Sequence, residues 1–181
     1  MSINAFLKID GIDGESTDDS FENWIDVITF SFGVRQTSHV TGGTMKNVAE
    51  GKATLENLSV TKLLDNTTPT LYKYCATNKS IPEVQFVLCK TADGNKVPYM
   101  EYTLGDVIIT SIKNTIKTDI TQTIETSTDD NVIVKKDETI SYPIETVSFN
   151  YNLINWTYKV LNRSNEEEGK ISTSFDVGKN K

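Results

Sequence analysis

Residues 97–112 read VPYMEYTLGDVIITSI, a run rich in β-branched and aromatic residues that predicts one long strand. A shorter run precedes it, with Val84, Phe86 and Leu88 at every second position. Asp93 and Gly94 stand between the two runs, and Asp-Gly is a pair that favours a tight hairpin turn. The sequence therefore predicts an antiparallel hairpin at its centre.

The same period of two recurs along the chain. In residues 25–34 it places Ile28, Phe30, Phe32 and Val34 on one face and small or polar residues on the other, which predicts a half-buried strand. Further strands are expected at 5–9, 145–151, 154–160 and 171–177. These signals predict a mainly β protein, an antiparallel β-barrel or sandwich with one short flanking helix.

The helix is expected in DNTTPTLYKYCATNKS, residues 65–80. Thr68 can cap it, Pro69 suits the first helical position, and Asn78 ends the run. Leu71, Tyr74 and Cys75 are spaced by three and four residues, so the helix should be short and apolar on one side.

Two segments lack a clear period. Residues 37–52 are polar and contain three glycines, which indicates an extended loop between strands. Residues 113–144 are rich in threonine and charge, with isoleucines four residues apart at 116, 120 and 124, a spacing that suits either a helix or a strand. The threonines favour strand, and we expect a protruding hairpin with its turn at 129–131 and VIVKK on the returning side.

Composition limits the class of protein. With 181 residues and no linker or repeat, residues 1–181 are expected to form a single domain. The net charge is −7, which argues against nucleic acid as a partner, and no apolar run is long enough to predict membrane insertion. The N-terminus has no signal-peptide pattern, so we expect synthesis in the cytoplasm. Cys75 and Cys89 lack CxxC spacing and are expected to be free thiols.

The segment IDGIDGES, residues 9–16, places two Asp-Gly steps close together and so resembles a calcium loop. Counting an EF-hand loop from Asp10 puts Ile12 at the third ligand position and Phe21 at the twelfth. Counting from Asp13 also fails, because Trp24 falls where the glutamate ligand should be. We therefore expect a structural turn and no metal site.

No catalytic or cofactor-binding set is expected. His39 is the single histidine and no G-x-S-x-G motif accompanies it, while GTMKNVAEGK lacks Walker spacing. The acidic runs Asp129-Asp130 and Glu166–Glu168 occupy expected turns, where carboxylates usually face water. Many strands and no reactive site favour a protein that acts through its surfaces, with self-assembly as the leading class.

Several motifs together resemble the Hcp family, the haemolysin-coregulated proteins of type VI secretion. They occur in the family's order across residues 6–158, and the strongest are the 9–16 turn with Asp10, Gly11, Gly14, Glu15 and Ser16, and the spacing of Leu58, Lys62, Asp65, Pro69 and Leu71. The others are IDVITFSFG at 25–33, YTLGDVIITSI at 102–112 and ETVSFNYNLINWTY at 145–158.

The resemblance implies a homohexamer whose rings stack into a hollow inner tube. It implies sheath, spike and baseplate components as partners, expulsion by sheath contraction without a signal peptide, and secreted effectors carried in the lumen. It also implies that the family's ring-stacking loop falls at residues 37–52, and we expect it to include Thr41, Gly42, Gly43, Thr44, Met45, Lys46, Asn47, Glu50 and Lys52.

The sequence departs from the family pattern in two places, which limits how far the family's properties can be extended to it. Residues 113–144 replace a shorter, often glycine-rich stretch, and STSFDV at 172–177 lacks the usual Gly-Trp. Three alternatives stay open: a tail-tube protein of a phage or another contractile injection system, a soluble secreted effector carrier, and a carbohydrate-binding module that would use Trp24 and Trp156.

Overall fold

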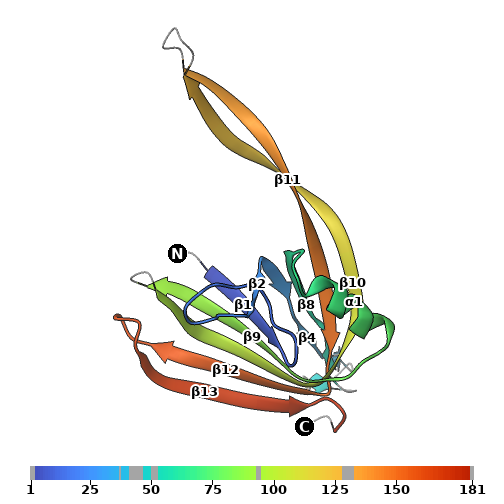
Figure 1. Cartoon of the computed structure of the whole chain (residues 1–181). Helices are drawn as coiled ribbons and strands as arrows, with labels where there is room; N and C mark the ends of the chain where they lie inside the picture. The colour runs from blue at the N-terminus through green and yellow to red at the C-terminus, as the bar shows by residue number, and fades with distance from the viewer. Residues whose placement is uncertain are drawn as a thin grey trace.

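The computed structural model describes residues 3–36, 38–40, 47–49, 53–92, 95–127 and 133–179. One helix and thirteen strands are found in these residues, and nine of the strands belong to one antiparallel sheet (Figure 1). The elements in chain order are β1 Ile3–Ile9, β2 Ile25–Val27, β3 Thr29–Ser31, β4 Val34–Arg35, β5 Ser38–Val40, β6 Asn47–Ala49, β7 Thr54–Leu55, β8 Leu58–Leu63, α1 Thr68–Ala76, β9 Ile81–Ala92, β10 Asn95–Ser127, β11 Ile133–Asn150, β12 Leu153–Leu161 and β13 Glu167–Asp176.

The strand order of the large sheet is β2-β1-β9-β10-β11-β8-β3, and β12 and β13 branch from β10. Because β10 bends away from β9 and then pairs with β11, the sheet folds over on itself and encloses a core of alternating side chains. In the described part of the chain β2 pairs only with β1 and β3 only with β8, so no closed barrel forms. Of the two architectures that the sequence predicts, a barrel or a sandwich, the structure has the sandwich.

The central hairpin is confirmed. β9 and β10 pair antiparallel from Asn95↔Ala92 to Val107↔Ile81, with the Asp-Gly step between them outside the described residues. Val84, Phe86 and Leu104 are essentially inaccessible to solvent, so the period of two places these side chains in the core as predicted.

The 25–34 segment differs from the single half-buried strand that its alternation predicts. The chain changes partners at Ile28, whose N–H donates to the Thr61 carbonyl, and β2, β3 and β4 each pair with a different strand. Ile28, Phe30 and Val34 are 42%, 37% and 57% exposed. Alternation predicts which side chains share a face, but whether that face is covered depends on the strands around it.

The predicted hairpin in 113–144 is confirmed as the outer part of β10 and β11. These strands pair from Ile108↔Asn150 to Ser127↔Ile133, and the ribbon rises far above the rest of the sheet (Figure 1). The expected turn at 129–131 lies outside the described residues. We call residues 113–127 and 133–144 the arm.

The predicted helix is present, with one correction at its start. α1 begins one residue earlier than a Thr68 cap would require, because Thr67 is the N-cap and Thr68 is the first helical residue. Leu71 is buried, and Asn78 adopts a φ of 50° just after the helix ends. Within 37–52, where a loop was expected, β5 and β6 form a short antiparallel pair.

Candidate functional site

The turn motif at 9–16 reverses the chain after β1. Gly11 has a φ of 75°, a left-handed conformation that glycine adopts without strain, and the Ile12 N–H donates to the Ile9 carbonyl at 3.0 Å. Asp10 and Asp13 are exposed, whereas Ile12 is buried. Among the described residues no cluster of three metal-ligating side chains occurs.

Gly14 and Ser16 hold the following segment against the stretch before β2. The Gly14 N–H donates to Asn23 O at 2.8 Å and the Ser16 N–H to Trp24 O at 2.9 Å. A Cβ on Gly14 would lie 2.3 Å from Trp24 O, so only glycine fits there without displacement. Glu15 Oε1 accepts a hydrogen bond from the Asn66 N–H, which links the motif to the loop before α1. Four of the motif residues thus serve the turn or its docking.

A buried charge cluster accounts for Lys62 and Asp65 in the motif at residues 58–71. The Lys62 Nζ lies 2.6 Å from both Asp65 Oδ1 and Glu145 Oε1, and it also donates to the Leu63 carbonyl. The side chains of Lys62 and Glu145 are 1% and 0% exposed. Thr67 donates to Asp65, and the Thr68 hydroxyl donates to Glu145 Oε1 at 2.8 Å.

This cluster joins three elements: Lys62 comes from β8, Glu145 from β11 at the root of the arm, and Thr68 from α1. It offers no nucleophile paired with a base, and one ammonium joins two carboxylates from different segments of the chain, so it is suited to fixing α1 on the sheet. Sequence reasoning singled out Lys62 and Asp65 but missed Glu145. The missed signal was a glutamate at an inward position of the 145–151 alternation, where only a buried cation could compensate it.

The other predicted candidates are not brought together. The expected ring-stacking residues Thr41, Gly42, Gly43, Thr44, Met45, Lys46, Glu50 and Lys52 lie outside the described residues, and Asn47 begins β6. His39 lies in β5, and Asp129 and Asp130 are outside the described residues. Glu166 is exposed in the β12–β13 turn, and Glu167 and Glu168 are exposed at the start of β13.

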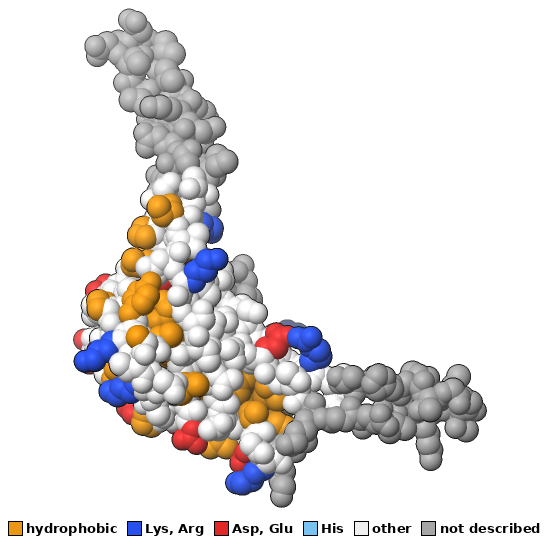
Figure 2. All heavy atoms as spheres, turned by 90° about the vertical axis from the view of Figure 1, so that its right-hand side faces the viewer, with side chains coloured by type: hydrophobic (Ala, Val, Ile, Leu, Met, Phe, Trp, Pro, Cys, Tyr) orange, Lys and Arg blue, Asp and Glu red, His pale blue; other side chains and the backbone are white. Residues whose placement is uncertain are grey.

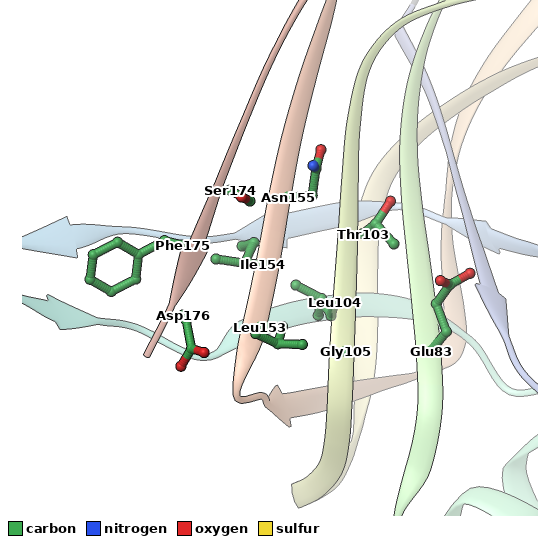
Figure 3. Close-up of a pocket in the computed structure, with 10 residues that line it drawn as sticks. All are labelled: Glu83, Thr103, Leu104, Gly105, Leu153, Ile154, Asn155, Ser174, Phe175 and Asp176. Carbon is green, nitrogen blue, oxygen red and sulfur yellow. The ribbon is translucent and has the colours of Figure 1, made fainter. Parts of the chain in front are cut away.

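A pocket of about 380 Å³ lies where β9, β10, β12 and β13 run side by side (Figure 3). Leu104, Leu153, Ile154 and Phe175 make much of its lining. Its two carboxylates, Glu83 and Asp176, come from β9 and β13 and stand at opposite ends of the view. Hydrogen bonds from the backbone and side chain of Lys179 lower the pKa of Asp176. This carboxylate is therefore already bonded within the turn that follows β13. The pocket thus lacks a pair of acids for hydrolysis.

The described surface also carries a depression of about 270 Å³ beside the turn motif, lined by both apolar and acidic side chains. The exposed apolar ones are Ile28, Leu63 and Leu64, at 42%, 50% and 38%, and the acidic ones are Glu15, Asp26 and Asp65. Burial of such side chains is worth about 25 cal/mol per Å² of apolar surface removed from water, so the depression favours contact with another surface. No helix in the described ranges is both long enough and apolar enough to span a bilayer.

Comparison with known proteins identifies the family. Residues 6–158 match the family model described as "Type VI secretion system effector, Hcp". The protein Hcp1 of Pseudomonas aeruginosa strain PAO1 is 33% identical over 112 residues, which cover 62% of this chain and 68% of that protein.

Two solved structures are similar over nearly the whole chain. A type six secretion system protein superposes with a TM-score of 0.78 at 25% identity, covering 99% of each chain. Hcp1 from Salmonella typhimurium superposes with a TM-score of 0.69 at 28% identity, covering 100% of this chain and 99% of its own. From the motifs, the fold and these matches together, the chain belongs to the Hcp family of type VI secretion proteins.

Proposed function

We propose that this chain is the structural subunit of a type VI secretion inner tube. Copies form hexameric rings that stack into a hollow tube, which sheath contraction expels and which carries effectors. In this role the chain is not an enzyme, and its partners are further copies of itself together with sheath, spike and baseplate components. Family membership supports this function, since ring and tube assembly is the family's role.

The observation that carries the proposal is the exposed apolar strip on the 25–35 segment and the adjoining end of β8. All five of its side chains are more than a third exposed: Ile28, Leu63 and Leu64, which share one depression, and Phe30 and Val34 farther along the segment. Phe30 also packs its ring against Phe86. A face of this kind that is left uncovered in one copy is suited to contact with the next copy. A contact between these side chains and a different face of the next copy would be heterologous, and heterologous contacts close into rings when the rotation fits.

Sedimentation velocity of strip variants tests the proposal. Ile28→Glu and Val34→Glu each place a carboxylate in the contact, and we expect both to shift the protein from the ring to the monomer. Ser80→Glu adds the same charge at an exposed position after α1 and serves as the matched control.

Two results would show that the strip does not form the contact between copies. In one, both strip variants sediment as the wild-type oligomer does. In the other, the Ser80→Glu control dissociates as fully as the strip variants, which would show a general charge effect. If wild-type protein is monomeric in every condition, the soluble effector-carrier function becomes the better account.

A further inference from the structure

The arm is an extended ribbon whose outer part has no neighbouring strand in the described chain. β9 pairs with β10 only as far as Val107, and β8 pairs with β11 only as far as Ile144. Beyond those points β10 and β11 pair with each other alone, over a length of about 40 Å at 3.3 Å per residue. An isolated two-stranded ribbon is marginally stable in water, and its open edges present unpaired backbone groups.

The side chains at the root of the arm are apolar and basic. Ile116 is 69% exposed, and Lys113, three residues before it and so on the other face of the strand, is exposed without an ion-pair partner among the described residues. Figure 2 shows hydrophobic side chains gathered on the body below the arm and continuing up its root, with basic side chains beside them. A strand added along the edge of β10 would therefore meet Ile116 on one face and Lys113 on the other, which suits a strand that carries an apolar and an acidic side chain at the same spacing.

The outer edge of β13 carries exposed glutamates and an exposed isoleucine, with the exposed Lys170 between them. β13 pairs with β12 on one side only, so its outer edge is open. Ile171 on β13 is 67% exposed, and Glu167 and Glu168 are exposed at its start. Ile116 and Ile171 are the two most exposed large hydrophobic residues among those whose side chains the structure describes.

The two segments also match in spacing. Lys113 precedes Ile116 by three residues, and Glu168 precedes Ile171 by three. A parallel alignment that sets Ile116 beside Ile171 therefore brings Lys113 to Glu168, which lies at the bulge near the start of β13. The complementary charges and the open edges together favour addition of one segment to the other.

We propose that the arm of one copy docks on the β13 edge of a second copy of this chain, with Lys113 beside Glu168 and Ile116 beside Ile171. The contact is heterologous, since one copy contributes the arm and the other contributes the edge. This inference rests on the proposed self-assembly and names a second surface for it, separate from the strip at Ile28 and Val34.

Zero-length carbodiimide coupling of a mixture of unlabelled and ¹⁵N-labelled full-length protein tests the contact. The reagent joins an amine to a carboxylate already in contact with it. We expect mass spectrometry to find mixed light–heavy peptides that join Lys113 to Glu168. If the assembled wild-type protein yields no such peptide, or if Lys113 couples instead to other carboxylates of the second copy, the proposed docking is wrong.

Charge exchange supplies the second measurement. Lys113→Glu and Glu168→Lys should each raise the dissociation constant between copies about fivefold, and the double variant should restore it. Lys79→Glu makes the same charge change at an exposed site after α1 and should leave association unchanged. Absence of rescue in the double variant would overturn the pairing.

The design separates this inference from the proposed function. Oligomeric wild-type protein without the Lys113–Glu168 product overturns the arm contact and leaves the ring intact. Monomeric wild-type protein without the product overturns both. Recovery of the mixed-isotope product supports the arm contact directly.

Discussion

The side chain of Lys62 is 1% exposed, and its ammonium group lies between two carboxylates. The positive charge is therefore compensated by groups inside the protein and not by water. One oxygen of the cluster, Glu145 Oε2, is buried without a hydrogen-bond partner in the described structure. Removing the cation would leave Glu145 buried and unpaired, which is the costly way to break such a cluster.

Lys62→Met should therefore lower the free energy of unfolding by about 3–5 kcal/mol, measured by urea denaturation at pH 7. The double variant Lys62→Met/Glu145→Leu should lose less, because it removes the uncompensated carboxylate as well. Lys73→Met, at an exposed site on α1, is the control. A Lys62→Met protein within about 1 kcal/mol of the wild type would show that the cluster contributes little.

Gly14 is a second residue with a role that only the structure defines. Gly14→Ala should reduce stability by about 1–3 kcal/mol, because the new Cβ would meet Trp24 O at 2.3 Å and displace the backbone. Gly169→Ala is the matched control, since a Cβ there meets nothing within 4 Å. Thermal unfolding of both variants measures the difference, and equal melting temperatures would contradict the close approach.

The two thiols should differ in reactivity. Burial raises the pKa of Cys89 to about 12, so this thiol is protonated at pH 8, whereas Cys75 is partly exposed. We expect Ellman's reagent at pH 8 to titrate Cys75 in the native protein and Cys89 only after unfolding. The Cys75→Ser variant leaves Cys89 as the thiol that can react with the reagent. Rapid reaction of the folded variant would show that Cys89 is nearer the surface than in the structure.

Among the elements, those with strong local signals could be predicted from the sequence. The hairpin at 84–112 follows from its alternation and its Asp-Gly step, and the arm follows from its threonines. The uncovered face at Ile28 and Val34 could not be predicted, because partner exchange at Ile28 depends on distant strands. The inward position of Glu145 could be predicted from its alternation, but its contact with Lys62 could not, since that contact joins residues far apart in the sequence.

The segment between the turn motif and β2 is tied to β10 by an ion pair. The Asp18 carboxylate lies 2.8 Å from Lys96 Nζ, and this partner lowers the pKa of Asp18 below its usual value near 3.8. Lys96 also lies over the ring of Phe6, which stacks on Phe21 at 4.2 Å. The ion pair therefore stands beside a second small core of aromatic side chains.

Because the folded pKa of Asp18 is depressed, its contribution to stability is present above the unfolded pKa and is lost as the pH falls through the folded value. The partly exposed pair should contribute less than about 1 kcal/mol. Lys96→Met should remove this contribution and raise the Asp18 pKa toward 3.8, as followed by NMR titration of its side-chain carboxyl. An unchanged titration below pH 4 would show that Lys96 is not the cause.

At the scale of the whole molecule, a single copy exposes apolar side chains and open strand edges on several surfaces. The apolar strip at Ile28, the outer arm and the open β13 edge are each of a kind that a neighbouring copy covers. Six copies together carry six times −7, a formal charge of −42, so a ring depends on apolar and strand-edge contacts or on segregated charge. Salt that screens this net repulsion should therefore strengthen association through the apolar contacts, whereas it should weaken the Lys113–Glu168 pair of the arm contact.

Native mass spectrometry of the full-length protein over about three decades of concentration, with negative-stain imaging of the same samples, tests self-assembly most directly. We predict a species of six 20.2 kDa chains, about 121 kDa, seen as annular particles. A protein that remains monomeric at every concentration, without annular particles, would contradict the account.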